Sequence, residues 1–367
     1  MESLSALKDF DYELPREFIA SYPASKRSDA RLLVLNRKTE EREHRIFRDL
    51  PDYLKAGDLL VLNNTKVLPA RLFGAKPSGG KVAALLLKPV GESDWEVLIK
   101  PNGRVKKGTR IIFGENGVRL EGEMLDDTNG ATGLRKIRFK IGDGPNGDSP
   151  WGASPEGVSP TGPSLISLIN QIGRVPLPPY LGRLDEVIDR ELYQTIFAEK
   201  EGAVASPTAG LHFDEELLES LRRKEIEICF VTLHVSYGTF QSVQEEDLSK
   251  HHMYEEEFEI SGEAAKKIQC ALKEKRRIVA CGTTVVRTLE TVGEKLETLR
   301  GTTRLFIYPP YEFKMVDAMI TNFHLPRTTL LMLVSAFAGR DFIFRSYEEA
   351  IRQRYRFYSY GDAMLIL

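Results

Sequence analysis

The stretch RIVACGTTVVRTLETV, residues 277–292, decides the fold. An apolar run ends at Cys281, a Gly-Thr-Thr turn follows, and Val285, Leu289, Val292 and Leu296 then recur at spacings of four, three and four. A short apolar run that stops at a turn signal predicts a buried strand, and the later spacing predicts a helix with one apolar face. The stretch therefore predicts a strand that runs directly into a helix, which is the unit of an α/β fold.

The chain after residue 164 repeats this alternation. The segment GEAAKKIQCALKEK (262–275) places Ala265, Ile268 and Leu272 on one face of a predicted helix just before the apolar run. Other short apolar runs alternate with helical patterns in the same part of the chain. This alternation predicts an α/β layer with largely parallel strands.

Residues 58–142 have a different pattern. The runs DLLVLN, KVAALLLK, DWEVLIK, TRIIF, GVRLEGEML and LRKIRFKI are short and strand-like, and Gly- and Asn-containing turns separate them. This spacing predicts a small β-barrel or sandwich. The next stretch, 143–163, is crowded with Gly, Pro and Ser, a composition that predicts a mobile loop or linker.

Composition bounds the class of protein. The 367 residues are enough for two domains, and 42% hydrophobic with 28% charged residues is typical of a soluble globular protein. The sequence predicts neither a transmembrane helix nor a secretion signal, so we expect a cytoplasmic protein. Three cysteines without CxxC spacing argue against a disulfide framework or a zinc ribbon.

Polar side chains follow four apolar runs of the second half. GAVA leads to Thr208 and His212, and EICFVTLHV contains His234 near its end. RIVAC leads to Thr283, Thr284 and Arg287, and VDAMI leads to Asn322 and His324. Because the carboxyl ends of parallel strands share one edge of a sheet, where ligands bind, we expect these side chains to meet in one site. A single histidine of this kind is more often a hydrogen-bonded structural residue, whereas three at equivalent places favour a site.

Arg287 allows two interpretations. If Thr283 or Thr284 caps the helix, Arg287 lies in its first turn, where a cation opposes the helix dipole. Either a nearby carboxylate pairs with this arginine, or Arg287 and the helix-opening amides hold a carboxylate or phosphate.

Other chemistries have weaker signals. Cys281, at a strand end beside a helix start, could be an activated thiolate, although a small core residue is the more common reading. The cluster HHMYEEEF (251–258) lacks a metal-ligand spacing, so no metal is expected. Neither GxGxxG after a strand nor GxxxxGK[ST] occurs, which leaves a dinucleotide site or a P-loop unsupported.

Long motifs in order make the chain recognisable. Among them are FDYELPREFIASYP (10–23), DLLVLNNTKVLPARLFG (58–74), VPLPPYL (175–181), PTAGLHFDEELL (207–218), VDAMITNFHLP (316–326) and YRFYSYGDAMLIL (355–367). The sequence resembles the S-adenosylmethionine:tRNA ribosyltransferase-isomerases, the QueA family of queuosine biosynthesis, along almost its whole length.

The resemblance implies a fold and a reaction. The fold is an irregular α/β barrel-like main domain, residues 1–67 and 158–367, with a smaller β-barrel domain inserted at 68–157. S-adenosylmethionine serves as a co-substrate whose ribosyl unit is transferred to preQ1 in the wobble position of tRNA and isomerised. Epoxyqueuosine-tRNA, adenine and methionine result. The expected partners are therefore preQ1-modified tRNA and S-adenosylmethionine, with a monomeric protein and no membrane.

The residues can be set against this chemistry. The sulfonium acidifies the ribose 5′ hydrogens, and adenine needs a proton donor to leave; both steps suit histidine at neutral pH. We expect His212 and His234 to transfer protons. The remaining candidates are expected to hold substrates, with Arg287 on the methionine carboxylate or on a tRNA phosphate; they are Thr208, Thr283, Thr284, Arg287, Asn322 and His324.

Some positions depart from the family pattern. Tyr254 stands where a second histidine is usual, Ser236 where glycine is usual, Val285 where Ser or Thr is common, and Ser206 where alanine is usual. Two alternatives to the transferase therefore stay open: a paralogue that binds tRNA without this catalysis, and a hydrolase that depends on Cys281.

Overall fold

The computed structural model describes residues 6–114, 117–127, 133–141, 164–236, 238 and 243–367. The chain forms two compact units. The larger contains Met1–Lys66, Leu177–Leu184 and Glu191–Leu367, and the smaller contains Val67–Pro176 and Asp185–Arg190. The predicted mobile loop at 143–163 lies outside the described residues.

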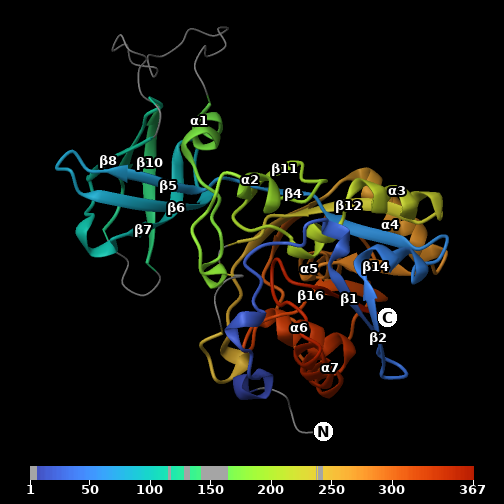
Figure 1. Ribbon diagram of the computed structural model, residues 1–367. Helices are drawn as coiled ribbons and strands as arrows, with labels where there is room; N and C mark the ends of the chain where they lie inside the picture. The colour runs from blue at the N-terminus through green and yellow to red at the C-terminus, as the bar shows by residue number, and fades with distance from the viewer. Residues whose placement is uncertain (1–5, 115–116, 128–132, 142–163, 237, 239–242) are drawn as a thin grey trace. The chain divides into compact units, whose positions relative to one another are not determined.

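A nine-stranded mixed sheet forms the centre of the larger unit (Figure 1). Its neighbours β12, β3, β14 and β16 are parallel, and antiparallel strands flank them on both sides. The predicted parallel layer is thus present at the middle of the sheet. In sheet order the strands are β15 (Arg300–Thr303), β13 (Glu256–Ile260), β12 (Glu227–Leu233), β3 (Leu59–Asn63), β14 (Ile278–Cys281), β16 (Ala318–Asn322), β17 (Ala363–Ile366), β1 (Arg31–Asn36) and β2 (Glu41–Ile46).

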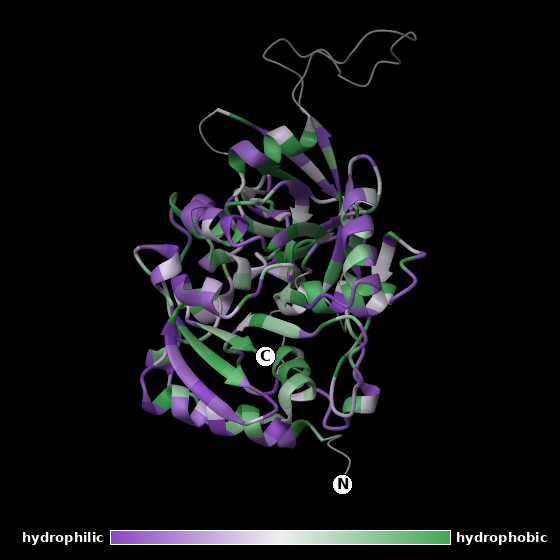
Figure 2. Cartoon of the chain, turned by 90° about the vertical axis from the view of Figure 1, so that its right-hand side faces the viewer, coloured by the Kyte–Doolittle hydropathy of each residue, from purple (hydrophilic) through white to green (hydrophobic). Residues whose placement is uncertain are grey.

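Both faces of this sheet are buried. Side chains alternate across a strand, so Leu59 and Val61 of β3 join one apolar core while Leu60 and Leu62 join the other. Figure 2 shows hydrophobic strands near the carboxyl terminus and helices in which hydrophobic and hydrophilic residues are mixed. Continuous apolar runs such as LLVLN are typical of strands covered on both faces.

Helices cover the two faces of the sheet. On one face, α3 (Glu215–Arg223) buries Leu217, Leu218 and Leu221. Fully burying each such leucine stabilises the fold by about 1.5–3 kcal/mol. The other face carries α4 (Gly262–Lys273), α5 (Thr283–Val292), α6 (Thr329–Ala338) and α7 (Arg340–Arg352).

The helix predicted from the opening stretch is shorter than its apolar spacing indicates. The α5 helix ends at Val292 because Gly293 caps it, so Leu296 lies beyond the helix although it is still buried. Gly282 is the N-cap residue, and neither Thr283 nor Thr284 caps the helix. Arg287 is therefore the fifth residue of α5 and does not lie in its first turn.

One of the four predicted strands does not belong to the large sheet. The run GAVA contributes to β11 (Lys200–Ala203), which pairs with β4 (Thr65–Val67) in a separate two-stranded sheet. Gly202 permits this placement, since a Cβ there would lie 2.8 Å from the imidazole of His234.

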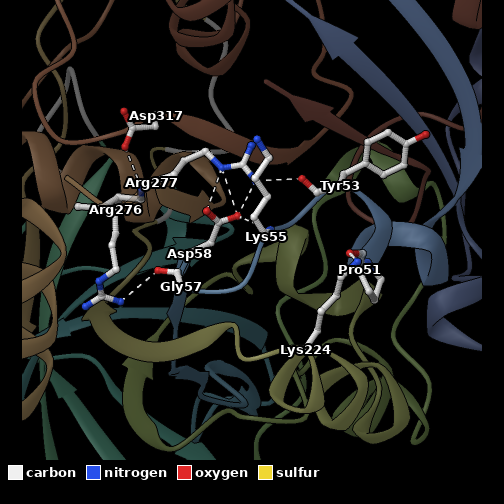
Figure 3. Close-up of polar contacts among 10 residues, drawn as sticks. Pro51, Tyr53, Lys55, Gly57, Asp58, Lys224, Arg276, Arg277 and Asp317 are labelled. Carbon is white, nitrogen blue, oxygen red and sulfur yellow. Dashed lines mark hydrogen bonds and ion pairs between the residues drawn. The ribbon is translucent and has the colours of Figure 1, made fainter. Parts of the chain in front are cut away.

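An ionic cluster joins the amino-terminal ends of β3 and β14 (Figure 3). Arg277 Nη2 donates to Asp58 Oδ2 at 2.5 Å and to the Tyr53 carbonyl at 2.9 Å. The Lys55 amide also donates to Asp58, and the Ile278 amide donates to Asp317. Asp58 is buried, and these several donors together offset the cost of burying its charge.

The smaller unit is a closed antiparallel barrel, as the strand spacing predicts. Of the strand-like runs in 58–142, however, DLLVLN does not belong to it: this run forms β3 of the large sheet, where both of its faces are buried. Its strands close in the order β10-β7-β6-β5-β8-β9. Their bounds are β5 (Arg71–Ala75), β6 (Lys81–Pro89), β7 (Asp94–Lys100), β8 (Arg110–Phe113), β9 (Leu120–Met124) and β10 (Leu134–Ile141). The predicted class, an α/β protein with an inserted β-barrel, is confirmed. Helix α1 (Leu165–Ile172) buries Leu168, Ile169 and Ile172 in the barrel core, so it belongs to this unit; the sequence placed it in the main domain.

Candidate functional site

The first pocket of the larger unit, here called the strand-end pocket, has an empty volume of about 520 Å³. It lies where β12, β14 and β16 end, at the sheet edge opposite the ionic cluster of Asp58 and Arg277. The lining residues are Tyr180, Tyr193, Ala205, Ser206, Pro207, Thr208, Ala209, Val235, Gly282, Thr283, Thr284, Thr321, Asn322, His324, Leu330, Tyr358 and Ser359.

The amino terminus of α5 opens onto this pocket. Gly282, Thr283 and Thr284 are the N-cap and the first two helical residues, and all three line it. Gly282 has φ +91°, a conformation that L side chains rarely adopt, and this turn joins β14 directly to the helix. The first amides of a helix have no intrahelical partner and present partial positive charge, so this wall can bind electron-rich ligand atoms.

Asn322 connects two of the predicted residues. Thr208 Oγ1 donates to Asn322 Oδ1 at 3.2 Å, while Asn322 Nδ2 donates to His212 Nε2 at 3.0 Å and to the Tyr358 carbonyl at 3.1 Å. Thr208 and Asn322 line the pocket, whereas His212 lies behind Asn322 and packs on the ring of Phe47. Burial lowers the pKa of His212 to about 3, with smaller contributions in the same direction from the charges of Arg356 and Arg27. His212 is therefore neutral at pH 7.

His324 is the histidine that lines the strand-end pocket. Its Nε2 contacts Thr321 Oγ1 at 2.9 Å, and its amide donates to the Tyr347 hydroxyl at 2.9 Å. Burial lowers the pKa of His324 to about 3, so this ring is also neutral at pH 7. A neutral imidazole can offer one donor and one acceptor to a ligand.

His234 faces another side of the sheet end. The neighbouring Val235 lines the pocket, and His234 Nδ1 instead contacts Thr65 Oγ1 of β4 at 2.8 Å. The imidazole lies against Gly202 of β11 and is half-buried, which lowers its pKa. The structure does not bring His234 into the pocket with Asn322 and His324.

Arg287 lines a second pocket, here called the Arg287 pocket, with an empty volume of about 890 Å³. The two pockets are adjacent, since Leu330 lines both. The guanidinium pairs with Glu256 and its Nε donates to the Leu305 carbonyl at 3.0 Å. Of the two interpretations of Arg287, the ion pair with a carboxylate is therefore present. The helix-opening amides face the other pocket.

Comparison with known proteins shows which family the chain is related to. A family model described as queuosine biosynthesis protein matches residues 7–366. The chain is 51% identical to the S-adenosylmethionine:tRNA ribosyltransferase-isomerase of Sulfurihydrogenibium sp. (strain YO3AOP1), over 98% of this chain and 99% of that protein. The enzyme of the same name from Aquifex aeolicus (strain VF5) is 50% identical over the same shares.

The chain belongs to the queuosine biosynthesis protein family. A crystal structure of the S-adenosylmethionine tRNA ribosyltransferase of Thermotoga maritima at 2.00 Å resolution is also similar. It is 40% identical and has a TM-score of 0.53, with 98% of this chain and 100% of that chain covered. The family resemblance seen in the motifs is thus confirmed over the full length.

Several lining residues of this family member were not singled out from the sequence. Tyr180 and Tyr358 meet edge to face with ring centroids 4.0 Å apart and form an aromatic wall. Tyr358 has φ +72°, and such strain in a non-glycine residue is concentrated at functional sites. Asn63 at the end of β3 does not line the pocket itself but donates to Thr284 Oγ1, which does, at 3.2 Å. The sequence did contain a signal for Asn63, because two asparagines end the apolar run DLLVLNN.

Cys281 does not have the surroundings of an activated thiol. Its side chain is buried in the core beneath α3, and burial raises the pKa of the thiol. A thiolate needs nearby positive charge and access, and burial works against both. The structure therefore gives no support to the cysteine-dependent hydrolase.

Three of the residues that depart from the family pattern can be placed in the structure. Ser236 does not have a positive φ, so the serine causes no strain of that kind. Val285 packs in the main core, and Tyr254 is exposed at the rim of the Arg287 pocket.

Within the described residues, no group of three or more His, Cys, Asp or Glu side chains is arranged to hold a metal ion. Among the same residues, no helix combines the length and apolar character needed to cross a membrane.

Proposed function

We propose that this chain transfers the ribosyl unit of S-adenosylmethionine to preQ1 in the wobble position of tRNA and isomerises it, with release of adenine and methionine. Relatives over the full length carry the name of this transferase. The observation that carries the proposal is the strand-end pocket, which combines an aromatic wall, a helix amino terminus and four threonines. The proposed setting is a monomer in the cytoplasm.

The chemistry of the lining favours a nucleoside. None of the residues around the strand-end pocket carries a formal charge at pH 7, since its histidine is neutral and burial raises the pKa of Tyr180. Aromatic rings such as Tyr180 and Tyr358 stack on purines, and the hydroxyls of Thr283 and Thr284 suit a ribose. We therefore assign the adenosine part of the co-substrate to this pocket.

The reaction needs a proton acceptor at the ribose 5′ carbon and a proton donor for adenine. His212 and His234 stay the proposed carriers of these protons. A nucleoside in the strand-end pocket is separated from His212 by Asn322. It could contact His234 only if the His234 side chain turned from its present side towards the pocket. His324 already lines the pocket, so a share in proton transfer by His324 is the alternative that its position supports.

The test is product formation. Purified protein with S-adenosylmethionine and preQ1-tRNA should release adenine and methionine in equal amounts, measured by liquid chromatography, and tRNA without preQ1 should release neither. Binding of preQ1-tRNA without adenine release would favour the tRNA-binding paralogue. His212→Asn, His234→Asn and His324→Gln, compared at equal folded fraction, identify the carriers, because a variant with wild-type turnover removes its residue from the mechanism.

A further inference from the structure

We propose that the Arg287 pocket is an anion subsite in which Arg287 Nη2 and Ser236 Oγ bind one carboxylate or phosphate group of a substrate. The proposal rests on the proposed function for the identity of the substrates. It does not depend on turnover for its test, because it concerns binding. The pocket adjoins the proposed nucleoside site at Leu330, so one extended ligand can occupy both.

Arg287 provides the first donor. Two of its nitrogens are used within the protein, on Glu256 and on the Leu305 carbonyl. The third, Nη2, is buried and has no hydrogen-bond partner among the residues that the structure describes, and the whole residue is only 5% exposed. A buried N–H group without a partner costs about 1–3 kcal/mol, more when it is charged, so such a group in a pocket wall points to a ligand.

Ser236 provides the second donor. Its amide donates to Glu256 Oε1 at 2.8 Å, which fixes the serine beside the ion pair. Its Oγ is buried and has no partner among the described residues, and Ser236 lines the same pocket as Arg287. Glu256 therefore holds both residues by their other groups and leaves one free donor on each.

The remaining charges favour a zwitterionic amino acid as the source of the anion. Glu256 is neutralised by Arg287, while Glu245 at the exposed rim can attract an ammonium group and Lys250 adds a second cation. His251 and His252 complete the titratable lining. A methionine moiety presents one carboxylate and one ammonium, and a tRNA phosphate presents only the anion. We therefore assign the methionine end of S-adenosylmethionine to this pocket.

Calorimetry of ligand binding tests the assignment. Arg287→Met should weaken S-adenosylmethionine binding at least about tenfold, or roughly 1.4 kcal/mol, and Ser236→Ala about fivefold. Neither change should alter the affinity for decarboxylated S-adenosylmethionine, which lacks the carboxylate. If Arg287→Met does not fold by circular dichroism, Arg287→Lys replaces it, since lysine keeps the charge opposite Glu256 but cannot present the second nitrogen.

Ser335→Ala is the matched control, because Ser335 Oγ is also buried, has no partner within the described part of the chain, and lines neither pocket. Unchanged S-adenosylmethionine binding, together with weaker binding of a preQ1-containing anticodon stem-loop and a lower salt dependence, would support the anion subsite with phosphate as its source. If the Arg287 and Ser236 variants bind both ligands as well as Ser335→Ala does, the subsite is refuted. If the wild-type protein binds S-adenosylmethionine but shows no turnover, the proposed function is refuted and the anion subsite is not.

Discussion

At the scale of single residues, burial sets the protonation of the site. His212 and His324 have different partners, Asn322 for one and Thr321 for the other, yet burial lowers the pKa of both to about 3. Each ring thus offers a fixed donor and a fixed acceptor near neutral pH. For His324, which lines the strand-end pocket, this property suits recognition of a neutral nucleoside. The low pKa makes each ring a weak base until substrate binding changes its surroundings.

A dependence of stability on pH follows. The folded protein excludes a proton that each unfolded histidine binds below pH 6.5, so the free energy of unfolding falls as pH drops from 6.5 towards 3. The expected slope is about 1.4 kcal/mol per pH unit for each histidine. His212→Asn should remove one histidine's share, measured by urea unfolding between pH 7 and 5. An equal slope in variant and wild type would contradict the buried neutral state.

Cys281 gives a second prediction at this scale. Cys281→Ala should keep wild-type kcat, because the thiol is buried and protonated, and it should lower the free energy of unfolding by about 1–2 kcal/mol through a small cavity. Steady-state kinetics and thermal unfolding of the same preparation measure both. A collapse of kcat in a folded variant would restore the thiolate hypothesis.

Predictability differed among residues. The rule that ligand groups follow the ends of parallel strands placed Thr283, Thr284, Asn322 and His324 at one edge, and all four line the strand-end pocket. Thr208 lines it too, although the strand before it, β11, lies outside the large sheet. The rule could not say on which side of an extended chain a residue points. His234 and Val235 are neighbours, and only Val235 faces the pocket. Partners distant in the chain, such as Tyr180 and Tyr358, could not be paired from spacing alone.

At the scale of elements, the turn between β14 and α5 positions the helix amides. Gly282→Ala should strain this turn by about 1–2 kcal/mol, because its φ is +91°. Relaxation of the turn moves the amides of Thr283 and Thr284, so the KM for S-adenosylmethionine should rise several-fold. Kinetics and thermal unfolding are to be compared in the same variant.

Gly339→Ala is the control for this turn. Gly339 joins α6 to α7 with φ +88°, and it lines neither pocket. It should lose similar stability with an unchanged KM. If Gly282→Ala leaves the KM at the wild-type value, the role of the α5 amides in binding is wrong.

The opposite ends of the same strands carry the ionic cluster of Asp58 and Arg277 (Figure 3). Asp58→Ala leaves Arg277 and the Lys55 amide without their partner, and breaking a buried pair in this way costs about 3–5 kcal/mol. Urea unfolding should show this loss, while kcat and KM stay within twofold because the pocket lies at the other edge. Asp94→Ala, which breaks an exposed pair with Arg138, should cost less than about 1 kcal/mol. Similar losses in the two variants would contradict the buried role of Asp58.

Elements were the most predictable level. Strand-like runs predicted most of the barrel strands, and apolar runs predicted β12, β14 and β16, because both patterns reflect burial on one or two faces. The run DLLVLN was assigned to the barrel region and is instead β3 of the large sheet. Pairing was less accessible. The pattern did not show that β11 leaves the main sheet for β4, or that α1 packs on the barrel, since such choices depend on contacts between distant segments.

At the scale of the whole molecule, one edge of the large sheet gathers the proposed chemistry. An uncharged, aromatic pocket and a pocket with a free arginine nitrogen adjoin at Leu330, both within the larger unit. A nucleoside linked to an amino acid matches this division of polarity. Motifs in their family order made the reaction predictable from the sequence, whereas the split into two pockets required the positions of side chains.

The most direct test of the account follows the ribosyl unit itself. The protein is incubated with preQ1-tRNA and S-adenosylmethionine that is isotopically labelled in its ribose, and the wobble nucleoside is analysed by mass spectrometry. The account predicts that the label enters the nucleoside as epoxyqueuosine and is absent from the released adenine and methionine. An unlabelled wobble nucleoside, with or without free adenine, would contradict the account.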